Sequence, residues 1–415
     1  MTLNLPVAEL LGDNIPWLHD FRCRGRELFT KTELPNAKTE AWRYTKPNMY
    51  LSQDFISPVQ GEETDYTPEL PFAAYHICFT NGVFAPAISD LPEEITVLPL
   101  IEGIMFHPEI REKIGALALA DKYPFAALNN AYLNEGIYIH LPKGYQLDRP
   151  LALINFVAAD STKPMFNLHN LIIADEGAKA EIVEYYLYRG EVKSAYFTNV
   201  VNEIYLAKGA CLDHYKLQNE AFKAIHLALN CVSVSQDGFY KSFCLQKGAD
   251  LARNETQVTL CESKAQAEVD AAYLMNGWAT LDITTDIKHL AAETYSDQLV
   301  KGVVGGQAKG VFQGCIHIAP NAVKTRGNQQ HRALLLSDEA EVDAKPELEI
   351  YADDVQCSHG SACGQLDAEQ LFYMRSRGLS EDAAKKILVD AYINEVIAKV
   401  DNEKIAEWIK LKLNQ

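Results

Sequence analysis

The sequence predicts a mainly β chain with helical regions at both ends. Strand-like segments crowd the middle of the chain, from about residue 135 to about residue 351. Short turns that contain glycine recur between them, and the apolar residues change to a helical period in about the last fifty residues. A chain of 415 residues with 48% hydrophobic content is long enough for two or three domains and a large core.

The beginning of the chain, residues 1–134, is predicted to be a helical and then mixed N-terminal region. Asn14-Ile-Pro-Trp17 is typical of a helix start, because proline is favoured at the first helical position. Trp17, Phe21 and Leu28 then recur at helical spacing. His76 to Phe84 indicates a β-hairpin that turns at Asn81-Gly82.

The middle of the chain is predicted to form repeated units of strands and tight turns. Three of these turns resemble one another, and their glycines, Gly177, Gly209 and Gly238, lie 32 and 29 residues apart. A period near thirty residues is typical of the stacked coils of a β-solenoid. A β-sandwich has similar turns, so the pattern alone leaves both architectures open. The strand-like segments include residues 151–157, 168–173, 180–188, 200–206, 225–234 and 268–274.

A glycine-rich run between residues 299 and 317 invites comparison with phosphate-binding loops. It contains no Gly-Lys-Ser/Thr ending and no G-x-G-x-x-G motif, and a strand-like segment follows it. We therefore interpret its glycines as turn residues between strands. Cys315 and His317 lie at the end of this run beside Ile316 and Ile318, and we expect both to be core residues.

The C-terminal segment, residues 365–415, is predicted to be a small helical domain. Asp367 is suited to cap a first helix, and Ser380 begins a second helix with acidic residues in its first turn. A third, short helix is expected around Ile405 to Leu413.

Composition excludes several classes of function. The formal net charge of −18 would repel a phosphate backbone, so nucleic acid is not an expected partner. The first 21 residues contain no Lys or Arg, and no apolar stretch approaches about eighteen residues, so we expect a cytoplasmic protein with no membrane partner. Nine cysteines at irregular spacing do not resemble a disulfide framework. Four of them are expected to be reduced core residues: Cys78, Cys231, Cys244 and Cys261.

No complete catalytic or zinc motif is present in the sequence. We find no G-x-S-x-G, no H-E-x-x-H and no pair of C-x-x-C motifs. We therefore expect a protein that is not an enzyme.

One stretch near the end of the strand-rich region concentrates groups that can titrate or bind metals. Within eleven residues lie Asp353, Asp354, Cys357, His359 and Cys363. The polar and apolar alternation just before them is typical of a half-buried strand, so the stretch is expected to continue or close a sheet. In an extended chain Cys357 and His359 project from the same side, where a thiol and an imidazole suit a metal, a sulfur or a partner protein. A structural turn that closes the sheet remains the alternative.

Several motifs along the chain resemble the SufB/SufD family, the scaffold subunits of the Suf iron-sulfur cluster assembly machinery. The resemblance is carried by Lys345 to Gly360, by the segments around it, and by an N-terminal Lys-x-Glu-x-Trp-x-Tyr-Thr signature at Lys38 to Thr45. The other matching segments are residues 309–314, 340–343, 364–367 and 370–378. These segments cover both ends and the middle, so the whole chain is identified as a member of the family.

The resemblance implies a right-handed parallel β-helix core at residues 135–364, between the two helical regions. It also implies that the chain pairs with the sister subunit SufB through the β-helix and docks the ATPase SufC on its C-terminal helical domain, with ATP bound to SufC. By the same resemblance His359, with Cys357 beside it, lies near the SufB interface. His359 matches the family histidine that helps a SufB cysteine to hold an iron-sulfur cluster or iron transiently.

Two positions distinguish this chain within the family pattern. SufB carries Glu after the histidine, whereas this chain has Gly360, which together with the length favours the SufD branch. Cys363 stands where a small or apolar residue is expected, and we interpret it as a filler, with an additional thiol at the site as the alternative.

Two other hypotheses remain. A stand-alone β-helix enzyme that cleaves acidic polysaccharides with Asp, Lys and Arg in a groove is the alternative function. A homodimer is a further possibility, because a β-helix edge that pairs with a similar subunit can pair with itself.

Overall fold

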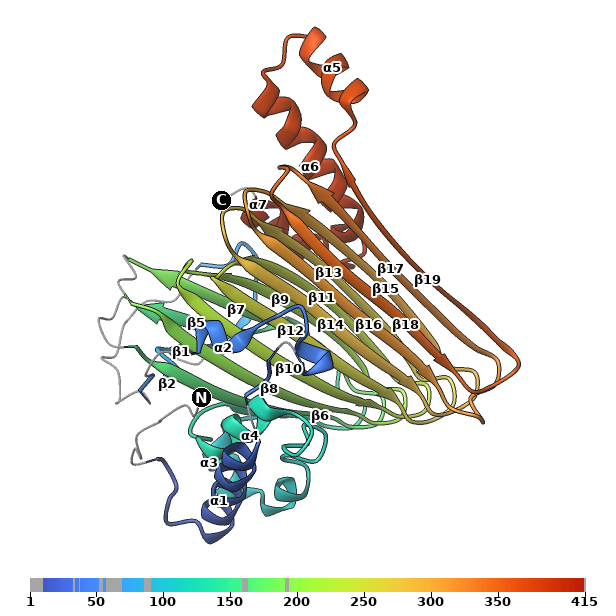
Figure 1. Cartoon of the computed structure of the whole chain (residues 1–415). Helices are drawn as coiled ribbons and strands as arrows, with labels where there is room; N and C mark the ends of the chain where they lie inside the picture. The colour runs from blue at the N-terminus through green and yellow to red at the C-terminus, as the bar shows by residue number, and fades with distance from the viewer. Residues whose placement is uncertain are drawn as a thin grey trace.

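The computed structural model of the chain describes residues 10–32, 34–36, 38–51, 55–56, 69–85, 91–158, 163–190 and 194–413. Within these residues the strands form two sheets that face each other along the molecule (Figure 1). One sheet contains, in spatial order, β19 (Val355–Gln365), β17 (Thr325–Leu335), β15 (Tyr295–Val304), β13 (Gln266–Met275), β11 (Phe239–Gly248), β9 (Cys211–Glu220), β7 (Lys179–Arg189), β5 (Leu151–Ala158), β1 (Tyr75–Thr80) and β2 (Val83–Ala85). The other contains β18 (Glu341–Ile350), β16 (Lys309–Ile318), β14 (Thr280–His289), β12 (Leu251–Leu260), β10 (Ala224–Val234), β8 (Tyr196–Leu206), β6 (Met165–Ala174), β4 (Ile137–Leu141) and β3 (Thr96–Pro99).

Successive strands from β4 onward alternate between the two sheets, so each coil contributes one strand to each sheet. Neighbouring strands of these coils are parallel, as in the pairing of β10 with β12 from Ile225 opposite Leu251 to Val234 opposite Leu260, and only β2 and β3, at the far end of the described sheets, pair antiparallel with their neighbours. This arrangement confirms the parallel β-helix that the family resemblance implies and shows that the β-sandwich alternative is wrong. All six segments expected to be strands lie within β5, β6, β7, β8, β10 and β13.

The tight turns on one side of the solenoid explain the period of about thirty residues. In each turn the third residue after the preceding strand has a left-handed backbone. These residues are Gly177 with φ 71°, Gly209 with φ 65° and Asp237 with φ 55°. Gly238 is therefore one residue away from the position that the glycine spacing predicts. An aspartate tolerates the left-handed conformation better than most residues do. Gly238 is small for another reason, because a Cβ there would lie 2.9 Å from Val234 Cγ1.

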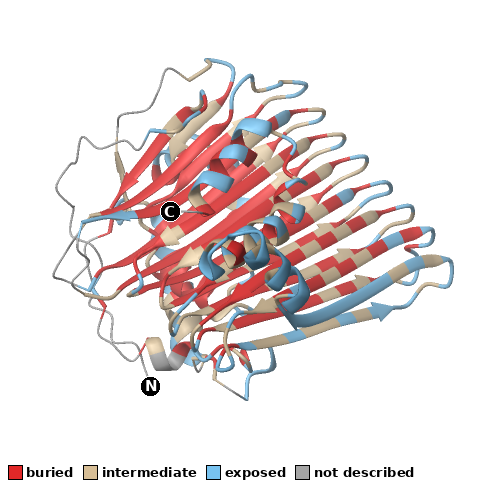
Figure 2. Ribbon diagram, turned by 90° about the horizontal axis from the view of Figure 1, so that it is seen from above, coloured by how far each residue is buried: buried red, intermediate tan, exposed pale blue. Residues whose placement is uncertain are grey.

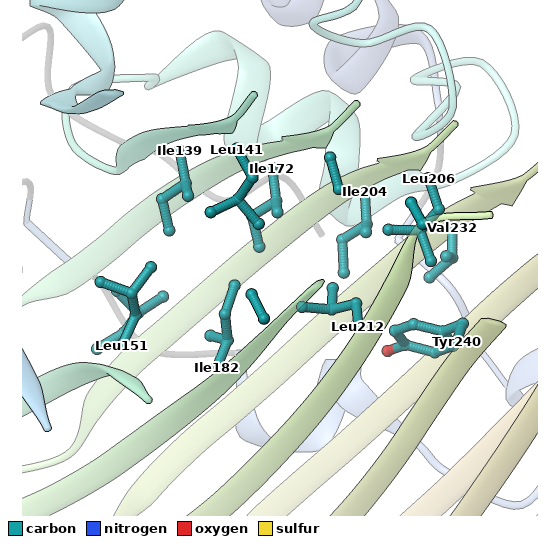
Figure 3. Close-up of a cluster of buried hydrophobic side chains, with 14 of the residues drawn as sticks. Ile139, Leu141, Leu151, Ile172, Ile182, Ile204, Leu206, Leu212, Val232 and Tyr240 are labelled. Carbon is teal, nitrogen blue, oxygen red and sulfur yellow. The ribbon is translucent and has the colours of Figure 1, made fainter. Parts of the chain in front are cut away.

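The hydrophobic core lies between the inner faces of the two sheets. Figure 3 shows side chains of both sheets meeting there, among them Ile172 and Ile204 on one side and Ile182 and Leu212 on the other. A line of polar side chains crosses this core, because Asn202 accepts a hydrogen bond from Asn170 at 2.8 Å and donates one to Asn230 at 2.7 Å. The interior is thus held by polar ladders as well as by apolar packing.

The N-terminal region packs on the outer face of the nine-stranded sheet. It contains α1 (Pro16–Lys31), η1 (Glu40–Trp42), α2 (Pro47–Tyr50), α3 (Leu100–Phe106), η2 (Pro108–Glu112) and α4 (Pro124–Ala131). Leu18 of α1 and Ile104 of α3 join the cluster that covers Leu171 on β6. The predicted helix start at Pro16 and the hairpin at Asn81-Gly82 are both confirmed.

The C-terminal helices pack on the opposite side, against the outer face of the ten-stranded sheet. They are α5 (Ala368–Ser376), α6 (Glu381–Ile397) and α7 (Glu403–Leu413). Trp408 of α7 meets Tyr185 of β7 edge to face at 5.0 Å. Lys399, just after α6, reaches Asp270 at 2.9 Å and Asp297 at 2.6 Å. The three predicted helices are therefore confirmed, and α5 projects away from the body together with the start of α6 (Figure 1).

Candidate functional site

The last coil of the solenoid carries the candidate site. Its strands are β18 and β19, and each of them stands at the end of its sheet in the described part of the chain. β19 is largely exposed and β18 mixes exposed and half-buried residues, as the pale blue and tan edge strands in Figure 2 show. The stretch that the sequence singles out therefore does close a sheet, and Asp353 and Asp354 lie in the connection between β18 and β19.

Cys357 and His359 face inward, toward the space between the two sheets. In β17 the residues at alternate positions are buried, including Gly327, Gln329 and His331. Cys357 pairs with Gly327 and His359 with Gln329, so both continue the inward rows of the coil below. The prediction that the two side chains share a face is confirmed.

The two residues differ in their environment. Cys357 is half-buried and packs beside Ile316 and Leu348. Burial raises the pKa of the Cys357 thiol above its ordinary value, so the free chain holds a thiol rather than a thiolate. His359 is exposed, because no further coil covers it in the described residues. Cys363 is also exposed on the same inward row, and partial burial raises its pKa.

The opposite inward face, from β18, is apolar. Gly310, Phe312, Gly314, Ile316 and Ile318 of β16 are buried and lie at alternate positions, on the face that Ile316 and Ile318 turn inward. The β18 residues that pair with them therefore form the inward row of the last coil, and they are Val342, Ala344, Pro346, Leu348 and Ile350. The open end thus has a row of thiol, imidazole and hydroxyl groups on one strand and an apolar row on the other.

The side chain beneath His359 has no hydrogen-bond partner. Gln329 is fully buried, and neither polar atom of its amide is hydrogen-bonded in the described residues. The Gln329 amide packs closely against Gly314 of the other sheet, because a Cβ on Gly314 would lie 1.9 Å from Gln329 Nε2. Buried polar groups without partners are costly, so the Gln329 amide is an unsatisfied polar group directly beneath His359.

These residues supply only part of a metal site. Among the described residues no group of three or more His, Cys, Asp or Glu side chains is placed to hold a metal ion. Cys357 and His359 offer a sulfur and a nitrogen ligand, which are the kinds that iron accepts. Any metal bound there requires further ligands from outside the described chain.

Cys315 and His317 are not core residues, so that prediction is wrong. Ile316 and Ile318 take the inward positions of β16, and the alternation of a strand therefore turns Cys315 and His317 to the outer face. His317 Nδ1 lies 3.0 Å from Glu349 Oε2. Burial and the charge of Asp286 raise the pKa of Cys315 to about 12.

Both residues line a cavity of about 790 Å³ on the outer face of the nine-stranded sheet. Residues 39–42 of the N-terminal segment line one wall of this cavity, and the segment is fixed to the strands below. Arg253 of β12 lies over the Trp42 ring at 4.2 Å and donates to Asp282 at 2.6 Å. Thr45 also donates to Asp282, and Lys345 of β18 bonds to Glu40 at 2.9 Å.

Among the nine cysteines, Cys78, Cys231 and Cys244 are buried as expected, whereas Cys261 is half-buried.

Trp42, Glu40 and Thr45 thus belong to a packing motif. Their partners Arg253 and Asp282 were not predicted, because nothing in the local sequence of β12 or β14 marks them.

No helix among the described residues is long and apolar enough to cross a membrane.

Comparison with known proteins assigns both parts of the chain. Residues 156–392 match the SufBD core domain of the SUF system of iron-sulfur cluster assembly, and residues 8–153 match the SufBD protein N-terminal region. The iron-sulfur cluster assembly protein SufD of Escherichia coli is 28% identical over 96% of this chain and 95% of its own length. A SufBD family protein of Synechocystis is 28% identical over 90% of this chain and 85% of its own, and the chloroplastic protein ABCI7 of Arabidopsis thaliana is 28% identical over 97% and 88%. Since the core-domain match covers more than half of the residues, the chain belongs to the SufBD family of iron-sulfur cluster assembly proteins.

Proposed function

We propose that this chain is a non-catalytic scaffold subunit for iron-sulfur cluster assembly that pairs with SufB through the open end of its β-solenoid. The observation that carries the proposal is the uncovered inward face of the last coil, where Cys357 and His359 project. The edges of β18 and β19 have no strand partner in the described residues. Long exposed strand edges pair readily with other strands, so a second solenoid suits this end.

In this proposal the cluster, or iron, is cargo shared by the two subunits. His359 supplies an imidazole nitrogen, Cys357 lies beside it, and a SufB cysteine supplies a further ligand. An exposed imidazole is free to turn toward a partner, which supports His359 as the main contribution of this chain. The raised pKa of Cys357 means that binding iron through its sulfur would release a proton.

Residues 365–415 are proposed to dock the ATPase SufC, which itself binds ATP. Helix α5 has no buried residue, although it carries Phe372 with 73% of its surface exposed and Tyr373 with 58% exposed. Large exposed aromatic side chains on a projecting helix are typical of a protein interface. Residues 135–364 would then act as the scaffold core in the cytoplasm, with residues 1–134 anchored to it.

The experiment that tests this function is cluster assembly in a co-expressed complex with SufB and SufC. We expect His359→Ala to lower the bound iron and acid-labile sulfide roughly tenfold, because a ligand is lost, while the three proteins still purify together. His317→Ala is the matched control, since His317 is a half-buried histidine on the outer face of β16. Unchanged iron and sulfide in the His359→Ala complex would remove His359 from the assembly site.

The same purification tests the alternative assembly. A solenoid edge that pairs with SufB can also pair with a second copy of this chain. We expect a homodimer of the isolated chain, if it forms, to be displaced when SufB is added. A homodimer that persists with excess SufB would contradict pairing through the last coil.

A further inference from the structure

A hydrogen-bonded chain of three side chains leads from the core of the solenoid to the candidate site. Tyr273 of β13 and His331 of β17 are fully buried, and the Tyr273 hydroxyl lies 2.8 Å from His331 Nε2. On the other side of the ring, His331 Nδ1 lies 3.2 Å from Ser361 Oγ of β19. The imidazole is also stacked on Phe312, with ring centroids 4.8 Å apart and planes 4° apart. The ring is therefore held in one orientation.

The three hydrogen-bonded side chains donate in one direction, from Tyr273 through His331 to Ser361. Burial raises the pKa of Tyr273 well above its ordinary value, so its hydroxyl keeps a proton that must be donated. His331 Nε2 is the acceptor found for that proton within the described residues. Burial also lowers the pKa of His331 to about 4, so the ring is neutral near pH 7 and carries one proton. That proton must lie on Nδ1, where it is donated to Ser361 Oγ.

Ser361 is left with a proton of its own to donate. Its oxygen already accepts from His331, and its hydroxyl makes no other hydrogen bond among the described residues. Ser361 is exposed and pairs with His331, so it lies on the same inward row as His359 and Cys363. The hydroxyl is therefore a donor that buried groups orient toward the open end.

The side chains around Ser361 indicate which kind of group accepts the proton of its hydroxyl. A hard anion such as phosphate or a carboxylate is usually held by Arg or Lys, but the inward rows of β18 and β19 contain neither in the described coil. The rows hold instead two thiols, an imidazole and apolar side chains. A large, polarisable and weakly hydrated sulfur anion suits such a surface better than an oxygen anion does.

We infer that the Ser361 hydroxyl donates a hydrogen bond to a sulfur anion, a sulfide or a thiolate, held against the inward face of the last coil. His331 and Tyr273 act as positioning residues that fix this donor. The inference rests on the proposed function, because cluster assembly is what brings such a sulfur to the open end. Hydrogen bonds to sulfur are among the factors that set the reduction potential of a cluster.

The first test concerns the proton on His331 and needs no cluster. Nitrogen NMR of the full chain with labelled histidine, assigned with His331→Gln, is expected to show a proton on Nδ1 and none on Nε2. Tyr273→Phe removes the hydroxyl that selects this tautomer, so the Nε2-protonated form should gain population in that variant. A proton on Nε2 in the unaltered chain would overturn the inference and leave the proposed function untouched.

The second test uses the co-expressed complex with SufB and SufC. Ser361→Ala is expected to lower bound sulfide and iron roughly tenfold and to shift the reduction potential of the remaining cluster to more negative values. Ser361→Thr keeps the hydroxyl and should restore both. Ser358→Ala is the matched control, because Ser358 faces outward on the same strand and donates to Asn328 at 2.7 Å.

The two proposals fail in distinguishable ways. If Ser361→Ala matches the unaltered complex in yield and potential while His359→Ala does not, the inference about Ser361 is wrong and the scaffold function stands. If neither variant has an effect, the last coil is not the assembly site and both fall. A loss of yield in Ser358→Ala equal to that in Ser361→Ala would also overturn the inference, since the effect would then belong to the strand.

Discussion

Glu135 is a carboxyl group buried where no cation is paired with it in the described residues. Among the described residues its carboxylate accepts a single long hydrogen bond, 3.4 Å from the Phe84 backbone N–H. Burial raises the pKa of Glu135 to about 7. The protonated form is therefore favoured in the folded state, and Glu135 becomes a cost to stability once it ionises.

The pH dependence of this cost is a testable prediction. Below the unfolded pKa of about 4.5, Glu135 is protonated in both the folded and the unfolded state. The stability of the folded state that depends on this proton is lost as the pH rises through the folded pKa of about 7. We expect Glu135→Gln to leave the unfolding free energy nearly unchanged at pH 4 and to raise it at pH 8 by on the order of 2 kcal/mol. Denaturant unfolding at both pH values measures this. An equal gain at the two pH values would contradict the account.

Arg253 illustrates the opposite case of a buried charge with several partners. It donates to Asp282 at 2.6 Å and to Glu255 at 2.9 Å while it stacks over Trp42. We expect Arg253→Lys to destabilise the chain by about 2 kcal/mol, because lysine cannot keep the forked geometry.

Arg332→Lys is the control for this prediction. Arg332 is half exposed and lies 3.6 Å from the exposed carboxylate of Glu395, so its replacement should cost less than about 0.5 kcal/mol. Urea unfolding of both variants gives the comparison. Equal losses would show that the contacts of Arg253 add nothing specific to stability.

At the scale of the element, the strands could be predicted from sequence where local signals agree. Tight turns and strand-like segments located β5, β6, β7, β8, β10 and β13, and the caps at Asp367 and Ser380 located α5 and α6. Cys315 and His317 were misplaced because apolar neighbours were read as evidence of burial. In a strand such neighbours show instead that the residue between them faces the other way.

Helix α5 provides a prediction at this scale. Because Phe372 is 73% exposed and Tyr373 is 58% exposed, replacing both with alanine should leave the melting temperature within about 2 °C. The double variant should nevertheless lose most of its binding to SufC, measured by co-purification and by titration calorimetry.

Leu411→Ala is the matched control, since Leu411 is 58% exposed on α7 rather than on α5. It should bind SufC as the unaltered chain does. Retained binding by the Phe372 and Tyr373 double variant would place the docking surface elsewhere.

At the scale of the whole molecule, the fold joins residues that are hundreds of positions apart. Lys345 meets Glu40 across 305 positions, and Thr45 meets Asp282 across 237. Local propensity carries no information about such pairs, so the sequence alone could not show that the N-terminal signature is fixed to the outer face of the solenoid. The open end of the solenoid could not be predicted from the sequence either. The sequence predicts a thiol and an imidazole on one side of a strand, and only the stacking of the coils shows that this side is the inward face, which no further described coil covers.

The central claim is that this interior face contributes His359 to a cluster whose other ligands lie on SufB. The most direct test is pulsed electron paramagnetic resonance of the reduced, cluster-loaded complex in which only this chain carries nitrogen-15 histidine. We predict a magnetic coupling between the cluster and one labelled nitrogen, which disappears in His359→Gln and persists in His317→Gln. A loaded complex that shows no nitrogen-15 coupling, or one that keeps the coupling in His359→Gln, would contradict the shared site.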